Sequence, residues 1–254
     1  MKNILAIVNQ KGGVGKTTTC INLASSLAKT KRSTLLIDFD PQSNATRGSG
    51  IDPHSLDISA NDVLLGAQNI NEAIIKLENY GFSILPATPS LTESEVMLLS
   101  SDEKEYSLKN VIDSLDESYD YVLIDCPPSL NILTVNALAA ATGVIIPVQC
   151  EFYALQGLSE LMVTIDKIKE TTNTDLEIKG IIRTMYDSRN NLATDVSDQL
   201  IKYFKKKVFK TIVPRNIRLA EAPSHGMSVI DYDKYSKGAL AYLSLVGEII
   251  KQEK

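Results

Sequence analysis

One stretch of the sequence decides the fold: Lys11-Gly12-Gly13-Val14-Gly15-Lys16-Thr17-Thr18. It follows an apolar, β-branched run at 4–8 and opens a helical pattern at 17–28, which is the context that a phosphate-binding loop requires. Glycines allow backbone N–H groups to turn toward phosphate oxygens, and the helix N-terminus adds partial positive charge. We expect Lys16 to contact the β- and γ-phosphates of a nucleotide and the Thr17 hydroxyl to hold Mg²⁺. All eight residues are predicted to bind nucleotide.

Outward from this loop, apolar runs rich in β-branched residues alternate with helical patterns. Such alternation predicts an α/β fold with a doubly wound, mostly parallel sheet, helices on both faces and right-handed crossovers. Residues 48–73 are the least regular region, but no repeat or long linker interrupts the pattern, so we expect a single domain over residues 1–254. Predicted strands cover 4–8, 34–37, 82–85, 121–124, 144–148, 178–182 and 208–213; predicted helices cover 17–28, 105–115, 130–141, 155–169, 194–204 and 238–250.

The composition is that of an ordinary globular protein. Of 254 residues, 44% are hydrophobic, and 26 Lys and Arg residues stand against 31 Asp and Glu residues. Collagen-like, disordered and disulfide-scaffold classes are excluded. The longest apolar runs, such as 143–148, fall far short of the roughly 20 residues that cross a bilayer, and no secretory leader pattern precedes the glycine-rich loop. Cys20, Cys126 and Cys150 lack metal-site spacing, which favours a reduced, cytoplasmic location.

Charge is distributed unevenly along the chain. Residues 201–254 contain 11 Lys and Arg against 5 Asp and Glu, whereas the preceding 200 residues contain 15 against 26. Residues 201–219 hold seven basic side chains and no acidic one. A basic segment in an acidic protein indicates a polyanionic partner such as nucleic acid, and a solvated basic face is the alternative.

Three carboxylates follow predicted strands at the edge where α/β sheets bind ligands. Asp38 and Asp40 leave one strand, and alternation places them on the same side of the chain. One would support the water molecules of Mg²⁺ and the other would position an attacking water; capping of the next turn is the alternative. Asp125 ends the apolar run 121–124, a Walker B pattern. Thr17, Asp38 and Asp125 therefore form the predicted metal site, with Asp125 acting through water.

The loop departs from the common phosphate-loop pattern in two ways. Gln10 stands where Gly-x-x-x-x-Gly-Lys requires glycine, and a second lysine, Lys11, precedes the glycine pair. This sequence resembles the deviant Walker A motif of the ParA/MinD-type ATPases, which are P-loop NTPases that use ATP and Mg²⁺. The resemblance implies that Lys11 reaches across a nucleotide-sandwich dimer to the other subunit's phosphates, where a second cation suits phosphoryl transfer. It also implies that Asp40 positions the water, so that Lys11, Lys16 and Asp40 form the catalytic set.

The resemblance covers essentially the whole chain. Segments 125–130, 147–151, 153–158 and 213–226 look like those of the Soj branch of ParA, the small chromosomal partition ATPases. It implies an ATP-dependent homodimer, bound to double-stranded DNA without sequence preference and associated with the nucleoid in the cytoplasm. It further implies hydrolysis stimulated by a ParB/Spo0J-type centromere-binding protein during chromosome or plasmid segregation. Because the first strand begins by Asn3, we expect no N-terminal helix-turn-helix domain.

The resemblance also assigns base and DNA contacts. Pro214, Arg215 and Asn216 match the segment that lies against adenine, where an amide can pair with the base edge; a simple turn after the last strand is the alternative. Arg189 and Arg218 match positions that contact DNA phosphates, for which an always-charged donor fork is suited. Nearby lysines would widen the positive field, and the alternative for each is a solubilising surface charge: Lys202, Lys205, Lys206, Lys207 and Lys210.

Two other functions remain as alternatives. A MinD-like membrane switch would share the ATPase core and end in a basic amphipathic helix. Residues 240–254 do have helically spaced apolar positions, but that spacing is more typical of a helix packed on its own sheet, and the polar face carries Glu248 and Glu253. A metabolic P-loop kinase or ligase would need an acceptor site, and none is identifiable. We therefore expect no membrane partner.

Overall fold

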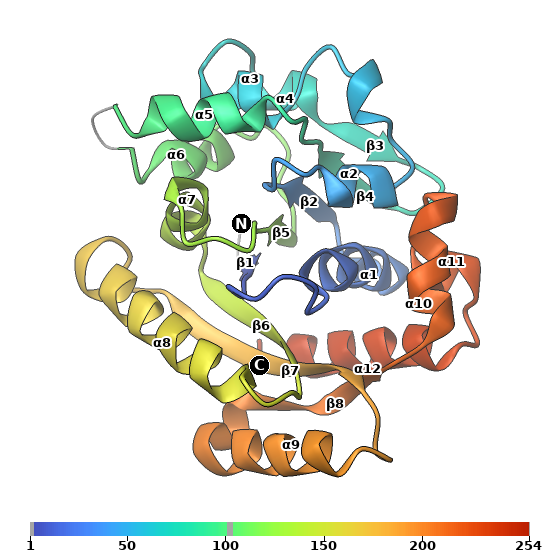
Figure 1. Ribbon diagram of the computed structural model, residues 1–254. Helices are drawn as coiled ribbons and strands as arrows, with labels where there is room; N and C mark the ends of the chain where they lie inside the picture. The colour runs from blue at the N-terminus through green and yellow to red at the C-terminus, as the bar shows by residue number, and fades with distance from the viewer. Residues whose placement is uncertain (1–2, 101–103, 254) are drawn as a thin grey trace.

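The computed structural model describes residues 3–100 and 104–253, so residues 1–2, 101–103 and 254 of the predicted domain lie outside it. Within the described residues, eight strands form one sheet in the order β3-β4-β2-β5-β1-β6-β7-β8 (Figure 1). Neighbouring strands run parallel except β3 and β4, which pair antiparallel. The predicted mostly parallel sheet is therefore confirmed. The strands are β1 (Asn3–Ile7), β2 (Thr34–Asp38), β3 (Ile75–Leu77), β4 (Phe82–Leu85), β5 (Tyr121–Asp125), β6 (Gly143–Gln149), β7 (Glu177–Tyr186) and β8 (Val208–Pro214).

All seven predicted strands are present, and β3 is an additional strand that the sequence pattern did not indicate. It has only three residues and pairs with β4 at the outer edge of the sheet. A strand this short offers too few alternating positions for a period-two pattern to be recognised. The central strands were recognisable because every residue of β2 and β5 is buried, which selects continuous apolar runs.

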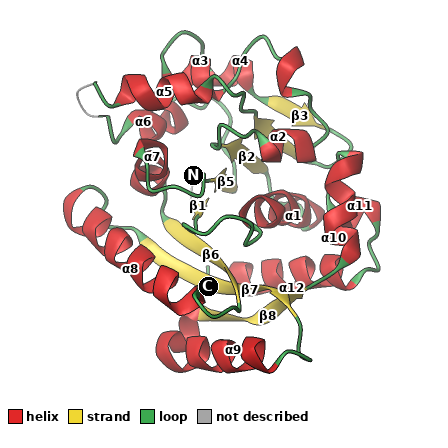
Figure 2. Ribbon diagram, viewed as in Figure 1, coloured by secondary structure: helices red, strands yellow, loops and turns green. Residues whose placement is uncertain are grey.

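Helices cover both faces of the sheet, as the alternation predicted (Figure 2). One face packs against α1 (Lys16–Lys29) and α12 (Lys237–Lys251) in a cluster that contains Leu23, Leu36 and Leu245. The opposite face packs against the other predicted helices, in a cluster that contains Leu133 and Leu158. The remaining predicted helices are also confirmed: α6 (Ser107–Asp113), α7 (Ile132–Ala140), α8 (Ala154–Thr171) and α9 (Asn191–Phe204).

The irregular region 48–73 folds into short helices with capped ends. Ser59 and Asp62 form a capping box, and the Asn69 side chain accepts from the amide of Asn71. Helices of three to eight residues give no sustained 3.6-residue period, so the sequence did not predict them. In this region and beyond it these elements are α2 (Asn44–Gly48), η1 (Pro53–Ser55), α3 (Ala60–Leu64), α4 (Ile70–Ala73), α5 (Leu91–Leu98), η2 (Lys205–Lys207), α10 (Ile217–Glu221), η3 (Ala222–His225) and α11 (Val229–Tyr232).

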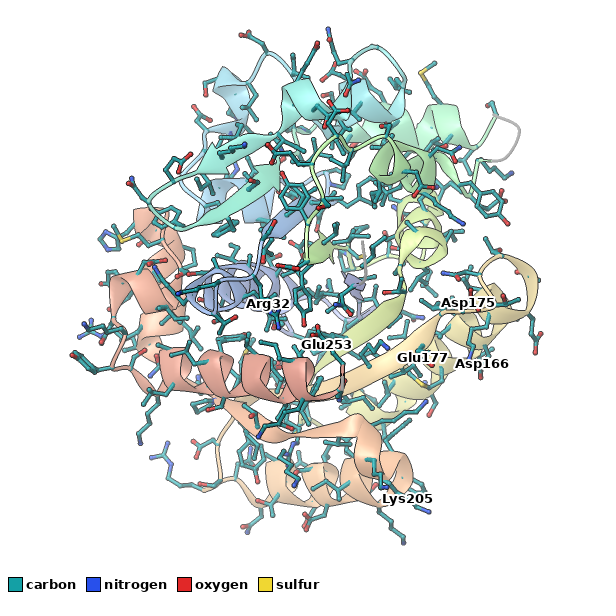
Figure 3. All side chains as sticks on the ribbon, turned by 180° about the vertical axis from the view of Figure 1, so that it is seen from behind. Arg32, Asp166, Asp175, Glu177, Lys205 and Glu253 are labelled. Atoms are coloured by element: carbon teal, nitrogen blue, oxygen red, sulfur yellow. The ribbon has the colours of Figure 1, made fainter. Side chains whose placement is uncertain are left out.

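Most apolar residues of the C-terminal helix α12 pack inside the protein, although Leu240 is 52% exposed. Leu245, Val246 and Ile249 are buried in the cluster shared with α1 and β8. Glu253, labelled in Figure 3, lies beyond the end of the helix. Its carboxylate accepts from Asn3 Nδ2 at 2.9 Å, which ties the helix to β1. The expectation that this helix packs on its own sheet is confirmed. None of the helices in the described part of the chain is long and apolar enough to cross a membrane.

The carboxyl ends of β1, β2 and β5 lie together at one edge of the sheet. In register, Asp38 lies beside Asp125, and Asp125 lies beside Ile7. The strand order reverses around β1, which has β5 on one side and β6 on the other. Such a switch point leaves a crevice at the carboxyl ends of the strands. The loop 8–15 leaves β1 at this edge and enters α1, so the sheet brings the predicted phosphate loop and both strand-end carboxylates together.

Candidate active site

The loop between β1 and α1 borders a cavity of about 620 Å³. Gly13 and Gly15 have φ values of 75° and 92°, in the left-handed region that glycine adopts without strain. Gly15 is also the N-cap of α1, so the unpaired amides of the first helical turn lie beside the cavity. This is the geometry of a phosphate cradle. The lining includes Gly12, Gly13, Gly15, Lys16, Thr17, Thr18, Asp40 and Pro128.

Lys16 lies in this cradle and is only 7% exposed. Its Nζ donates to the carbonyl oxygen of Lys11 at 3.3 Å, so the side chain is folded back under the loop. Burial lowers the pKa of Lys16, an effect that the charges of Asp125 and Asp40 oppose. A buried ammonium group is stabilised by an anion at close range. A phosphate bound in the cavity would therefore stabilise the buried ammonium group of Lys16.

Val14, which is also buried, does not line the cavity. Its carbonyl oxygen accepts from the hydroxyl of Thr184 on β7 at 2.8 Å. Val14 therefore fastens the loop to the sheet, while its neighbours Gly13 and Gly15 border the cavity.

Asp125 ends β5 and is completely buried below the loop. Its Oδ1 accepts from the thiol of Cys20 at 3.4 Å, and the Thr17 side chain acts to lower the pKa of the carboxylate. Its Oδ2 is buried with no hydrogen-bond partner among the described residues. Burial, followed by the charge of Asp38, raises the pKa of Asp125 to about 8. A divalent cation beside Thr17 would offset both effects, so these residues fit Mg²⁺.

Asp38 and Asp40 have different surroundings, although Asp38 ends β2 and Asp40 lies only two residues further on. Asp38 Oδ2 accepts from the amide and the hydroxyl of Thr46 at 2.8 and 2.6 Å, and Oδ1 accepts from the amide of Asp40 at 3.3 Å. Burial raises the pKa of Asp38 to about 6 despite these hydrogen bonds. Asp40 lines the cavity, and its Oδ1 accepts from the Gln42 amide at 2.9 Å. Asp38 thus anchors the segment that follows β2, whereas Asp40 borders the phosphate cavity.

The second lysine of the loop points away from the cavity. Lys11 Nζ forms an ion pair of 2.5 Å with Glu151, just beyond the end of β6, and its side chain is 42% exposed. Lys11 is absent from the lining of the phosphate cavity, although its carbonyl oxygen receives Lys16. Phe152 and Tyr153, next to Glu151, are exposed and stack edge to face. The Lys11 ammonium is therefore accessible from outside the subunit.

A second cavity, of about 530 Å³, adjoins the first. The two share Gly15, Thr18 and Met185 in their linings, so a nucleotide with its phosphates in one would place its base toward the other. Asn216 Oδ1 is buried without a hydrogen-bond partner among the described residues. The structure brings all three predicted base contacts to this cavity: Pro214, Arg215 and Asn216.

The predicted DNA-binding arginines lie on the surface, and each is paired with acidic side chains of its own chain. Arg189 donates to both carboxylate oxygens of Asp187, from Nε at 2.9 Å and from Nη2 at 2.7 Å. Arg218 forms ion pairs with Glu221 at 2.8 Å and with Asp233 at 3.4 Å. Hydrogen bonding by Arg189 lowers the pKa of Asp187 to about 2. Any phosphate that binds these arginines competes with these carboxylates.

Comparison with known proteins identifies the family. Residues 2–178 match the family model described as an AAA domain. The chain is 51% identical over 250 residues to the chromosome partitioning protein ParA of Myxococcus xanthus, covering 98% of this chain and 88% of that protein. It is 46% identical over 249 residues to the sporulation initiation inhibitor protein Soj of Bacillus subtilis, covering 98% of both. The chain belongs to the ParA/Soj family of chromosome-partitioning ATPases.

A solved structure adds the nucleotide. With a TM-score of 0.87 and 37% identity, this ParA/Soj-family chain resembles a Mycobacterium smegmatis protein, covering 100% of this chain and 96% of that one. That protein is described as a cobyrinic acid a,c-diamide synthase with bound ADP and magnesium. The ParA/Soj chain is an ATPase that hydrolyses ATP to ADP and phosphate with Mg²⁺ as cofactor. The synthase activity is that protein's own, because the ParA and Soj relatives share more of their sequence with this chain.

The sequence analysis did not identify three side chains that contact the predicted site residues. Thr46 fixes Asp38, Glu151 pairs with Lys11, and Cys20 donates to Asp125. Only Cys20 had a usable signal, because it lies three residues after Thr17 and therefore on the same face of α1. Thr46 and Glu151 are separated from the phosphate loop by turns whose course the sequence pattern did not indicate.

Proposed function

We propose that this ATPase, acting as one domain over residues 1–254, forms an ATP-dependent dimer that binds DNA without sequence preference. Hydrolysis would return the dimer to monomers, and a ParB/Spo0J-type partner would stimulate it in chromosome or plasmid segregation. The observation that carries the dimer is the position of Lys11, whose ammonium group is exposed and lies outside its own phosphate cavity. A lysine so placed is available to the phosphates of a facing subunit. The proposed location is the cytoplasm, on the nucleoid.

For hydrolysis, each residue of the cradle has a proposed role. Lys16 binds the β- and γ-phosphates. Thr17 and Asp125 hold the metal ion, and Asp125 does so through a water molecule. Asp38, on the neighbouring strand β2, supports this metal site. Bound Mg²⁺ would neutralise charge on the β- and γ-phosphate oxygens. Asp40, at the cavity wall, orients the attacking water, and Lys11 from the second subunit adds a positive charge at the transferred phosphoryl group.

The proposed base contact favours adenine. The orphaned Asn216 Oδ1 would accept from the exocyclic amino group of adenine, while Pro214 offers an apolar wall and Arg215 lines the same cavity. Guanine presents a carbonyl oxygen at the position of that amino group, so it would leave Asn216 Oδ1 facing another acceptor. The proposal therefore includes selection of ATP over GTP.

The proposed DNA contacts are Arg189 and Arg218. Both are on the surface, and a dimer would present two copies of each arginine to phosphates, which explains why DNA binding should require ATP in an acidic protein. Contacts to phosphates carry no base information, so binding would not depend on sequence. Pairing with Asp187, Glu221 and Asp233 would limit the affinity of the isolated monomer.

The deciding experiment compares DNA binding in the apo, ADP-bound and ATP-bound states, with light scattering as a measure of dimerisation. We expect binding and dimerisation in ATP alone, and loss of both in Lys11→Ala with ATP binding retained. Equal DNA binding by the ADP-bound monomer would contradict the proposal. Pelleting with liposomes in the presence of ATP tests the membrane alternative, for which the buried apolar face of α12 offers no support.

A further inference from the structure

We propose that Cys20 is a positioning residue for ATP hydrolysis, whose thiol fixes the Asp125 carboxylate so that Oδ2 is presented to the magnesium site. The inference rests on the proposed role of Asp125 as a metal-site residue. Cys20 is completely buried in α1, and its Sγ donates to Asp125 Oδ1 at 3.4 Å. The hydrogen bond joins residues 105 positions apart and links the helix after the phosphate loop to the end of β5.

The two oxygens of Asp125 are not equivalent. Oδ1 has the thiol of Cys20 as a donor, whereas Oδ2 is buried without a partner among the described residues. The terminal torsion of an aspartate is broad, so an unrestrained carboxylate samples a wide range of orientations. A donor held on one side favours the orientation in which one carboxylate oxygen faces Cys20. The free lone pairs of Oδ2 would then be directed toward the proposed magnesium site.

Cys20 occupies the position on α1 from which a second donor can reach this carboxylate. Thr17 and Cys20 are three residues apart and project from successive turns of the same helix face. Cys20 donates to Asp125, and the Thr17 side chain acts to lower the pKa of the same carboxylate. When Mg²⁺ binds, the Thr17 hydroxyl would turn its lone pair toward the metal. Cys20 is then the side chain of this pair that continues to hold the carboxylate.

The charges around Asp125 would influence the orientation of its carboxylate if no donor restrained it. Asp38 lies beside it in the sheet, and Asp40 lies nearby; both repel the carboxylate, whereas Lys16 attracts it. Without a donor on Oδ1, the balance of these charges would set the orientation of the carboxylate. Replacing a residue that hydrogen-bonds to a metal ligand and orients it commonly changes the affinity for the metal about 10-fold to 100-fold.

Three cysteine variants test the proposal. Cys20→Ala removes the donor, and Cys20→Ser keeps one. Cys126→Ala is the matched control, because Cys126 is equally buried beside Asp125 but its Sγ faces the carbonyl oxygen of Ile124, at 3.7 Å. The first readout is the affinity of the ADP-bound protein for Mg²⁺, by isothermal titration calorimetry. The second is the Mg²⁺ concentration that gives half-maximal ATP turnover.

We expect Cys20→Ala to weaken Mg²⁺ binding about 10-fold, at the lower end of such effects because a thiol is a weak donor. Cys20→Ser should bind Mg²⁺ within about a factor of two of the unmodified protein, and Cys126→Ala should be unchanged. Binding of ADP without metal should be the same in all variants. Urea unfolding measures the stability lost with each buried thiol, so a general packing defect would affect Cys20→Ala and Cys126→Ala alike.

Equal Mg²⁺ affinity in Cys20→Ala and Cys126→Ala would overturn the inference. So would equal losses in Cys20→Ala and Cys20→Ser, since the serine retains a donor. Asp125→Asn separates this result from the underlying assignment. If Asp125→Asn weakens Mg²⁺ binding while Cys20→Ala does not, only the role of Cys20 is wrong. If Asp125→Asn also leaves Mg²⁺ binding unchanged, the proposed metal site itself is wrong.

Discussion

Arg183 and Glu248 bind opposite polar groups of the same residue, Lys210. Arg183 Nη2 donates to the carbonyl oxygen of Lys210 at 3.1 Å, and the amide of Lys210 donates to Glu248 Oε2 at 2.8 Å. The pairing of β7 with β8 shifts register here, so these backbone groups would otherwise lack ladder partners. Because β8 ends at Pro214, in the lining of the base cavity, the two side chains fix the edge strand that leads to Asn216.

We expect Glu248→Ala to destabilise the protein by about 2–3 kcal/mol, because two backbone amides and the Thr211 hydroxyl lose a charged acceptor. Urea unfolding provides the measurement. Glu253→Ala, near the end of the same helix, serves as the comparison for a carboxylate that accepts from side chains only. If Glu248→Ala lowers the free energy of unfolding by less than about 0.5 kcal/mol, the register shift between β7 and β8 does not depend on this carboxylate.

Asp40→Ala should abolish ATP turnover and retain an ATP-dependent dimer. Asp40 borders the phosphate cavity, whereas Lys16, Thr17 and Asp125 remain to hold nucleotide and metal. The lost acceptor for the Gln42 amide should cost only about 1 kcal/mol. Turnover assays and light scattering measure the two properties, and Lys16→Ala is the control expected to lose ATP binding. An Asp40→Ala monomer that no longer binds ATP would make Asp40 a nucleotide or metal ligand instead.

Gly12→Val should bind ATP normally and fail to dimerise. A Cβ at Gly12 would meet no atom within 4 Å in the monomer, and its φ lies outside the left-handed region, so the subunit itself accommodates a side chain. The obstacle would come from the facing subunit, whose loop would approach Gly12 and Lys11. Gly13→Val is the contrasting variant, because φ of 75° at Gly13 should distort the cradle and weaken ATP binding itself. A normal dimer in Gly12→Val would refute the sandwich geometry at this position.

Asn216→Ala should lower ATP affinity about 10-fold and remove the preference for ATP over GTP, since the buried acceptor in the base cavity is lost. Fluorescence titration with labelled ATP and GTP measures both effects. Gly238 packs close to the Asn216 side chain, so unfolding of the variant should be checked in parallel. Retained discrimination against GTP would assign base recognition to other residues.

Arg189→Glu and Arg218→Glu should each weaken DNA binding of the ATP-bound protein while leaving ATP binding and dimerisation intact. One arginine lost from each subunit should lower the slope of log affinity against log salt by about 2. The structure adds the opposite variant: Asp187→Asn frees the Arg189 guanidinium and should raise DNA affinity. Salt titrations on two unrelated duplexes in the Asp40→Ala background provide the test. Unchanged slopes in both charge reversals would exclude these arginines as DNA contacts.

The sequence by itself determined the parallel sheet, its main helices and the phosphate loop. These features are encoded locally: burial on both faces gives β2 and β5 uninterrupted apolar residues, and residues 11–18 form one contiguous motif. Strand alternation also placed Asp38 and Asp125 at the carboxyl edge of the sheet. The short helices between 44 and 73 escaped prediction, because three to five residues cannot establish a helical period.

Only the tertiary structure decided what each carboxylate and lysine contacts. Asp38 accepts from Thr46, and Lys11 pairs with a glutamate 140 positions away; neither partner could be predicted from the sequence. The orientation of the Asp125 carboxylate depends on a thiol from a different element. Hydrogen bonds and ion pairs of this kind form between atoms within about 3.5 Å in space. Sequence periodicity specifies which face a residue occupies, but the partner on that face is set by how the elements pack.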